Sequence, residues 1–252
     1  MGSEKLLVLN DQRYTVIANE VLKSKMEMTL IEAKLLRLLV TQVAKEDKDL
    51  KTYTVNITQL ARFLQIPKND LYRDIKTLIR RLMKRDICIH NKDGWTVFLW
   101  LQQASYNDKT HMITLMLSEQ IKPFVLDLNK WFTQYKLSEI LYLDSFYAIR
   151  LYELLQCFLG ESYFKKEVFE ISILKLREYF ACESKYKTTR DFLIKTVFIA
   201  IREINAKTEL SVESEYIKQK NKIVSVKFTV MPNFEVIKKN REKQLQQKSI
   251  DI

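Results

Sequence analysis

The residues with the clearest chemical potential are cations and hydroxyls that gather around the start of a predicted helix in the second half of the chain. They are Lys185, Tyr186, Lys187, Thr188, Thr189, Arg190 and Lys195. Helix N-termini and basic or hydroxyl side chains suit phosphate oxygens, and Arg and Lys also reach guanine edges in a major groove. A predicted hairpin tip repeats the signal without an acid, at Lys218, Lys220, Asn221 and Lys222. Two basic features on separate elements predict a nucleic-acid interface.

A third basic feature lies on a predicted helix in the first half. Between Lys68 and Arg85 the sequence carries seven Lys and Arg residues against two Asp residues. On a helical wheel, the side that avoids the apolar stripe holds Lys68, Asn69, Tyr72, Arg73, Lys76 and Arg80. A solvated basic face and a DNA-contacting face explain this pattern equally well, and the sequence leaves both open.

Composition favours a polyanionic partner and excludes the common nucleotide-dependent enzymes. The chain has 42 Lys and Arg residues against 31 Asp and Glu residues, a formal net charge of +11. It has 3 glycines in 252 residues, where average usage would give about 18. The glycine-rich phosphate loops of P-loop and Rossmann proteins need several glycines close together, so neither motif can be written here.

Metal-dependent chemistry is not expected either. The histidines, His90 and His111, stand in different predicted strands, so the His-x-His site of a strand-nicking initiator cannot form. The cysteines, Cys88, Cys157 and Cys182, are too widely spaced for a zinc site and favour free thiols in a reducing cytoplasm.

The remaining acidic and apolar stretches have ordinary explanations. Glu46, Asp47 and Asp49 lie in a Lys-flanked loop and are expected to be solvated. The longest uncharged run, 94–107, is shorter than the ~20 residues that span a bilayer. We therefore expect a cytoplasmic protein that is not an enzyme and has no cofactor, no metal and no membrane partner.

Hydrophobic periodicity predicts the elements that position the basic residues. The first half is expected to contain helices at 30–45, 59–64, 69–85 and 119–128, and strands at 53–57, 87–91, 95–106 and 110–117. The expected caps are a Thr29–Glu32 capping box, Thr58, either Asn69 or Asp70, and Ser118. A helix-turn-helix followed by a β-ribbon is the winged-helix plan.

The second half repeats this plan. The expected elements are a helix from Asp144 or Ser145 to Gly160, a strand at 164–171, a Ser172-capped helix at 173–180, a long helix at 188–205, and a hairpin of 209–218 with 223–231. Short matches align Ile57–Leu60 with Ile171–Leu174, and Arg73–Ile75 with Arg190–Phe192. We therefore expect an α+β fold of two tandem winged-helix domains related by internal duplication. The expected boundaries are an N-terminal tail at 1–14, a first domain at 15–128, a second domain at 129–236, and a basic C-terminal tail at 237–252.

Two segments carry a resemblance to a known family. The block Leu137–Leu155, with SFYAIRLYELL at its core, and the later Tyr186–Phe192 with Arg202–Asn205, resemble plasmid replication initiators of the Rep_3 type. Those proteins bind repeated origin sequences called iterons. The likeness extends over most of the chain, from Ala18 through the second hairpin.

The resemblance implies a division of labour between the two domains. The second would place its recognition helix in the major groove of an iteron, with contacts at Lys185, Lys187, Thr188, Arg190 and Lys195. The first would form a dimer that represses its own gene, and would contact DNA in the replication-active monomer. Its counterparts would be Lys68, Asn69, Tyr72, Arg73 and Lys76. Thr196 departs from the family pattern, which often has a larger apolar residue on the core side.

The leading interpretation is a non-enzymatic initiator that binds double-stranded origin repeats, exists as a homodimer in equilibrium with monomer, and recruits a host helicase or initiator. The long apolar hairpin 95–117 is a candidate dimer edge. Two alternatives stay open: a winged-helix transcription regulator, and a basic scaffold that binds acidic proteins or lipids.

Overall fold

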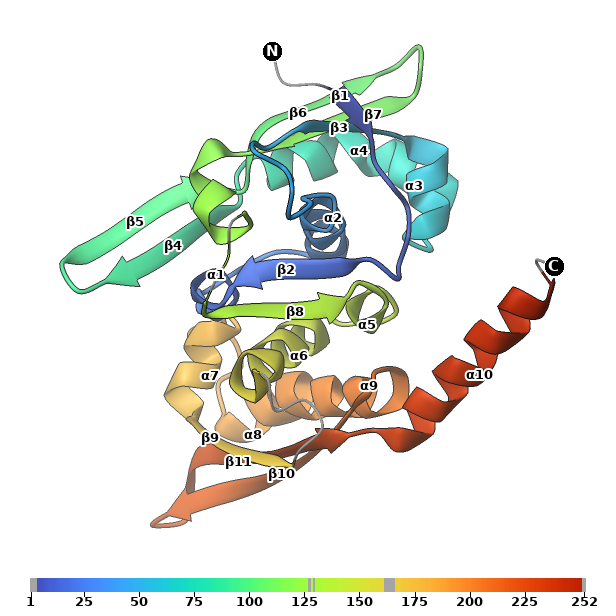
Figure 1. The fold of residues 1–252 in the computed structure, drawn as a ribbon. Coiled ribbons are helices and arrows are strands. Elements are labelled where there is room, and N and C mark those ends of the chain that lie inside the picture. Colours follow the sequence, from blue (N-terminus) through green and yellow to red (C-terminus); the bar gives the residue numbers. More distant parts are fainter. Residues whose placement is uncertain (1–3, 127, 129, 161–165, 251–252) are drawn as a thin grey trace. The chain divides into compact units, whose positions relative to one another are not determined.

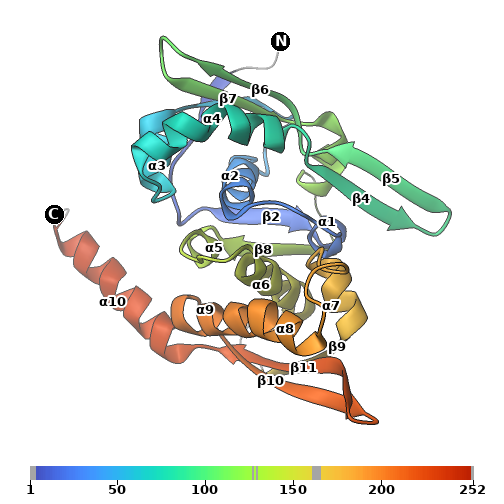
Figure 2. The same cartoon turned by 180° about the vertical axis from the view of Figure 1, so that it is seen from behind.

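The fold was analysed in a computed structural model that describes residues 4–126, 128, 130–160 and 166–250. The chain divides into two compact units, Met1–Leu141 and Tyr142–Ile252. Figures 1 and 2 show the elements from opposite sides.

The first unit is a helical core covered by a sheet and extended by a hairpin. Its helices are α1 (Asn19–Lys23), α2 (Leu30–Val40), α3 (Ile57–Phe63), α4 (Lys68–Leu82), the 3₁₀ turn η1 (Glu119–Phe124) and α5 (Ser138–Leu141). Its strands are β1 (Glu4–Leu6), β2 (Tyr14–Ala18), β3 (Thr52–Asn56), β4 (Asp86–Asn91), β5 (Gly94–Leu99), β6 (Leu101–Asn107), β7 (Met112–Leu117) and β8 (Phe132–Lys136). The main sheet has the strand order β1-β3-β7-β6, and α4 lies along it (Figure 2).

Local sequence explains the central helices of this unit. The Thr29–Glu32 capping box is present, and α2 is buried from Glu32 to Val40. It ends at Val40, before the expected Lys45. Helix α4 buries Leu71, Ile75, Leu78 and Leu82, the apolar stripe that the sequence predicts.

A buried carboxylate ties α2 to the end of α4. The Glu32 side chain is fully buried, and its oxygens lie 3.1 Å from Nε of Arg81 and 2.8 Å from a terminal nitrogen of Arg85. It also accepts the Thr29 backbone N–H at 2.9 Å, which closes the capping box. Arg81 and Arg85 therefore stabilise the fold of this unit, although the sequence places them in the same basic segment as the candidate DNA-binding residues.

The predicted strand 95–106 is wrong, because the chain changes sheets at Trp100. Strand β5 pairs with β4, whereas β6 pairs with β7. The Trp100 side chain is fully buried. Its backbone N–H donates to the Arg85 carbonyl at 3.0 Å, and its carbonyl accepts the Ser118 N–H at 3.0 Å. Trp100 lies between the two hairpins in the sequence, and its burial divides an apolar run that looks continuous. The β4–β5 hairpin leaves the body of the unit (Figure 1).

Several expected boundaries in the first unit also differ. Strand β1 pairs in parallel with β3, so the segment expected as a tail at 1–14 contributes an edge strand. Strand β8 pairs with β2, which places it in the first unit, beyond the expected boundary at residue 128. The predicted helix 119–128 is the shorter η1, and Pro123 lies inside it. Ser118 makes no side-chain cap there.

Two cap assignments in the first unit are wrong for a local reason. Helix α3 is capped by Asn56, whose side chain accepts the Thr58 N–H at 2.9 Å, so Thr58 lies inside the helix. Helix α4 starts at Lys68 directly after Pro67, so neither Asn69 nor Asp70 is its N-cap. In both cases the helix begins earlier than the apolar pattern indicates, because a preceding Asn or Pro sets its first turn.

The second unit has one three-stranded sheet and a helical layer. Its helices are α6 (Phe146–Leu159), α7 (Ile173–Tyr179), α8 (Thr189–Leu193), the π-helical segment η2 (Ile194–Phe198), α9 (Ile199–Lys207) and α10 (Phe234–Ile250). Its strands are β9 (Glu167–Ser172), β10 (Leu210–Gln219) and β11 (Lys222–Pro232), in the order β10-β11-β9. Ser145 caps α6, and Ser172 caps α7, as predicted. The expected strand start at Phe164 lies outside the described residues. The expected C-terminal tail is instead the helix α10.

The two units share a topology. In each, a long helix is followed by a strand, a short helix, a second long helix and a hairpin, and the first strand pairs with the last: β3-β7-β6 and β9-β11-β10. The first unit has the additional β4–β5 hairpin between α4 and β6. The sequence alignment of the short helices is two residues out, because Asn56 and Ser172 occupy the equivalent cap positions. Leu174 is accordingly 79% exposed, whereas Leu60 is fully buried.

One continuous helical segment forms from α8, η2 and α9, close to the predicted 188–205. The middle of this segment, Ile194–Phe198, is π-helical. Thr196 lies there, fully buried, and its hydroxyl donates to the Phe192 carbonyl at 2.6 Å. Its polar atom is therefore satisfied inside the core, which explains how this position tolerates a threonine.

The Glu32 site generates a stability prediction. Replacing Glu32 with Gln removes the charge that Arg81 and Arg85 share, while keeping the size of the side chain. Because Arg81 is half exposed, we expect a loss of about 1–2 kcal/mol in the free energy of unfolding. Urea denaturation of the full chain measures it, with the exposed Glu119→Gln as control. An unchanged urea midpoint for Glu32→Gln would contradict this role.

Candidate nucleic-acid interface

The helix formed by α8, η2 and α9 begins with a side-chain cap. The Thr188 hydroxyl accepts the Asp191 N–H at 3.0 Å and donates to the Asp191 carboxylate at 2.8 Å. Both hydrogen-bonding directions of this hydroxyl are thereby used within the helix. Thr188 lies at the helix start, as predicted, and its side chain caps the helix. Its backbone carbonyl accepts a hydrogen bond from Arg177.

The loop before this helix is organised by Arg177 of α7. One terminal nitrogen of the guanidinium donates to the carbonyls of Cys182 at 3.2 Å and Lys185 at 2.9 Å. The other donates to the carbonyls of Tyr186 and Thr188, each at 3.1 Å. The guanidinium carbon also lies 4.6 Å from the Phe192 ring centroid, in a cation–π contact. One planar cation thus fixes the course of the backbone that carries the basic side chains.

Tyr186 anchors the same loop from its other side. Its backbone lies in the left-handed region, with φ of 56°, which costs energy for a bulky residue and needs support from its surroundings. The support comes from its hydroxyl, 3.3 Å from the Tyr147 hydroxyl, and from its ring, 6.4 Å from that of Phe192. Burial, and then a hydrogen bond with Cys182, raise the pKa of Tyr147. Tyr186 therefore positions the loop more than it offers a free contact.

The cations of this loop and helix lie at the surface of the second unit. The side chains of Lys185, Lys187, Arg190 and Lys195 are exposed, and Thr189 is half-buried. The Lys195 ammonium lies 5.8 Å from the Tyr186 ring centroid, so loop and helix present their charges together. A surface of this kind combines fixed backbone with long flexible cations, which suits phosphate and base-edge contacts.

The hairpin of β10 and β11 carries the second basic group at its tip. Gln219 pairs with Lys222, and Lys220 and Asn221 form the two-residue turn between them. Both have positive φ, 45° and 64°, as a type I′ turn requires. The predicted residues Lys218, Lys220, Asn221 and Lys222 are all exposed. The hairpin extends beyond the helical layer of the second unit, like the wing of a winged helix (Figure 1).

The equivalent face of the first unit is partly neutralised. The Arg73 guanidinium lies 3.1 Å from the Asp70 carboxylate and 3.2 Å from that of Asp74, and its hydrogen bond lowers the pKa of Asp74. The Lys68 ammonium lies 5.4 Å from the Tyr72 ring centroid. Tyr72 in turn packs edge-on against His111 of the β6–β7 turn, with centroids 5.4 Å apart.

The other predicted residues of this face, Asn69, Lys76 and Arg80, are exposed. The structure thus brings together the predicted residues within each unit. Arg73 forms ion pairs with Asp70 and Asp74, and these carboxylates reduce the positive charge that this face offers to a phosphate.

Sequence reasoning misses the residues that hold this interface in place. Arg177 looks like a surface base on a short helix, and no local pattern marks its four carbonyl acceptors. The helical spacing of Tyr147 indicates core packing, and its hydroxyl contacts with Cys182 and Tyr186 depend on the tertiary fold. His111 attracts attention in the sequence only as a metal ligand. The Tyr106 hydroxyl lies 3.0 Å from the His111 ring, in a contact that depends on the fold of the β6–β7 hairpin.

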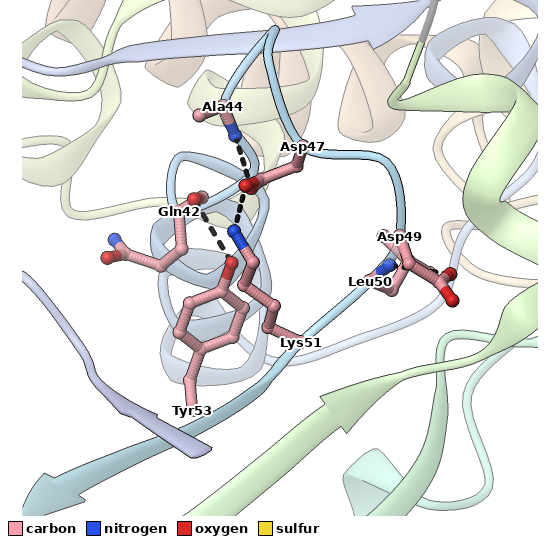
Figure 3. Close-up of polar contacts among 7 residues, drawn as sticks. All are labelled: Gln42, Ala44, Asp47, Asp49, Leu50, Lys51 and Tyr53. Atoms are coloured by element: carbon pink, nitrogen blue, oxygen red, sulfur yellow. Dashed lines mark hydrogen bonds and ion pairs between the residues drawn. The ribbon is translucent and has the colours of Figure 1, made fainter. Parts of the chain in front are cut away.

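Residues of the acidic loop at 44–51 form polar contacts with one another (Figure 3). The Asp47 carboxylate accepts the Ala44 N–H at 3.0 Å and pairs with Lys51. Asp49 points away from Asp47, accepts the Leu50 N–H, and binds the Lys122 ammonium at 2.9 Å. That hydrogen bond lowers the pKa of Asp49. Tyr53 closes the loop through a hydrogen bond to the Gln42 carbonyl.

The described residues show neither a metal centre nor a membrane span. Among them, His, Cys, Asp and Glu side chains nowhere gather in threes as metal ligands do. Within the same part of the chain, every helix falls short of the length or apolarity that crossing a bilayer requires.

The Arg177 contacts generate a prediction about loop order. Arg177→Lys keeps the charge but cannot hold four carbonyls with one ammonium. We expect faster amide hydrogen exchange across 182–188, with little change in the β10–β11 sheet. Hydrogen exchange followed by mass spectrometry measures this, with Arg202→Lys on the exposed side of α9 as control. Equal exchange in the 182–188 loop of wild type and Arg177→Lys would show that the clamp does not order it.

Comparison with known proteins identifies the family. The model described as "Initiator Replication protein, WH1" matches residues 15–156, and that described as "Initiator Rep protein, WH2" matches 172–230. A replication initiation protein from Escherichia coli is 27% identical over 175 residues, which make up 67% of this chain and 54% of that protein. The chain therefore spans about half the length of this relative.

A solved structure supports the same conclusion for the fold. The crystal structure of Pi initiator protein in complex with iteron DNA matches with a TM-score of 0.75 and 21% identity, over 88% of this chain and 98% of that one. The prediction of two tandem winged-helix domains is confirmed. The chain belongs to the family of replication initiator proteins whose WH1 and WH2 domains these models describe.

Proposed function

We propose that this protein binds double-stranded origin repeats and starts plasmid replication without enzymatic activity of its own. The observation that carries the proposal is the pairing of two exposed basic groups in the second unit: the clamped loop with its helix start, and the wing tip. The family membership and the fold match to an initiator bound to iteron DNA support the same partner.

Within the second unit, the two basic groups take different roles. Arg190, Lys187 and Lys195 belong to a helix and its leading loop, so they are suited to base edges in a major groove. Lys218, Lys220 and Lys222 lie on a hairpin tip, and they are suited to phosphates beside that groove. Base specificity would therefore come from the helix, and much of the salt-dependent affinity from the wing.

For the first unit we propose a second DNA contact and a dimer surface. Its DNA face would use Lys76, Asn69 and Arg80, because Arg73 is already paired with carboxylates. Its dimer surface would lie on the β4–β5 hairpin, where Trp95 is 67% exposed beside Val97 and Leu99. The dimer would repress the protein's own gene, and the monomer would recruit a host helicase or initiator in the cytoplasm.

Maintenance of a plasmid that carries this gene with its flanking DNA as the sole candidate origin would separate an initiator from a transcription regulator built on the same fold. We expect that deletion of the gene abolishes maintenance of such a plasmid, and that supplying the protein in trans restores it. Stable maintenance without the protein would contradict the initiator assignment.

The helix role predicts a specificity defect. Arg190→Ala should cost about 1–3 kcal/mol in binding to the preferred duplex, with a smaller loss for random duplex. Fluorescence anisotropy with both duplexes measures the two losses. Arg73→Ala is the matched comparison, and it should cost less because Asp70 and Asp74 already hold that guanidinium. Equal affinity of Arg190→Ala and wild type for the preferred duplex would exclude α8 as the reading helix.

The wing role predicts a change in salt dependence. Replacing Lys218, Lys220 and Lys222 with Ala should reduce the slope of log K against log salt by about 1 for each phosphate that the variant no longer neutralises. The reduction should be similar for preferred and random duplexes. Lys227→Ala on the same hairpin is the control, since Glu215 lies 3.2 Å from its ammonium. An unchanged slope in the triple variant would place the phosphate-binding cations elsewhere.

A further inference from the structure

Two large apolar side chains are exposed on the recognition helix of the second unit. Ile194 is 49% exposed and Phe198 is 55% exposed. The buried side of the same helix holds Phe192, Thr196, Ala200 and Ile204, each with no exposed surface. The core is therefore complete without Ile194 and Phe198, and their exposure needs another explanation.

The π-helical segment aligns these two residues with the basic face. In a regular α-helix, each four-residue step rotates by about 40° around the axis, so positions four apart drift away from one face. The wider turn at η2 reduces this drift, and both faces accordingly keep a four-residue spacing. Arg190, Ile194, Phe198 and Arg202 are all exposed, whereas Phe192, Thr196 and Ala200 are all buried.

The surroundings of the apolar pair indicate what covers it. Arg190 and Arg202 flank it along the helix, and Lys195 is exposed directly beside Ile194. Protein-binding surfaces are usually depleted of lysine, and their apolar core is larger than two side chains. A strip with two apolar groups between cations instead fits a polyanion whose surface contains small apolar features. In the major groove of a DNA duplex, that feature is the C5-methyl group of thymine.

We propose that Ile194 and Phe198 contact thymine methyl groups in the major groove, so that the helix selects sequence through methyl groups as well as through hydrogen bonds. The inference rests on the proposed binding of duplex DNA. It adds two specificity-determining residues, and it predicts that the preferred repeat contains thymines on the side of the groove that faces η2.

The test replaces single thymines by deoxyuridine, which lacks only the C5-methyl. A preferred duplex is first selected from random duplexes with the full chain, and each thymine in it is then exchanged in turn. For wild type we expect at least one position at which the exchange weakens binding by about fourfold, the effect of burying one methyl group. In Phe198→Ala or Ile194→Ala, binding should be weaker and the same exchange should have no effect.

Phe234→Ala, which removes another exposed phenylalanine, is the matched control and should keep the wild-type response. Equal binding of thymine and deoxyuridine duplexes at every position would overturn the inference while leaving duplex binding intact. A full deoxyuridine effect in both helix variants would also overturn it. Failure of wild type to bind any duplex at low salt would instead overturn the proposed function itself. Thermal unfolding of each variant verifies that it is folded.

Discussion

The candidate interface depends on one interaction, the four hydrogen bonds from Arg177 to the backbone of the loop before α8. Lys185, Lys187, Arg190 and Lys195 lie on or near this loop, and their mutual repulsion opposes a compact loop conformation. A guanidinium that donates to carbonyls fixes this backbone without using any of the outward-facing side chains. Tyr186, strained in the left-handed region, and the Thr188 cap complete the arrangement. Preorganised backbone lowers the entropy that ordering would cost on binding.

Local sequence signals predict the parts of the fold that depend on local chemistry. The caps at Thr29 and Ser172 are confirmed, and Ser145 is the cap among the two alternatives for α6, because each involves an oxygen and an amide two or three residues away. The misassigned caps of α3 and α4 have a local cause, whereas the larger errors arise where tertiary structure decides. Burial of Trp100 divides an apolar run between two sheets, and strand pairing absorbs the expected N-terminal tail. The assignment of the interface residues stays a prediction, although all of them lie on the expected elements. Arg177 could not be found from sequence, because its acceptors are carbonyls with no signature there.

The two units show how one topology can carry different surfaces. In the second, Lys187, Arg190 and Lys195 beside the helix start are exposed, and Asp191 serves the Thr188 cap. In the first, Asp70 and Asp74 hold Arg73, and Glu32 holds Arg81 and Arg85. Similar numbers of basic residues therefore give unequal amounts of available charge. This asymmetry supports a main DNA contact through the second unit and a partly structural role for the basic residues of the first.

The central claim is that the helix beginning at Thr189 reads the major groove. Methylation interference tests it most directly, because dimethyl sulfate modifies guanine N7 in the major groove and adenine N3 in the minor groove. We expect that N7 methylation at specific guanines of the preferred duplex prevents binding, while N3 methylation within the same half-turn has little effect. Binding that tolerates every N7 modification but is lost on N3 modification would contradict it.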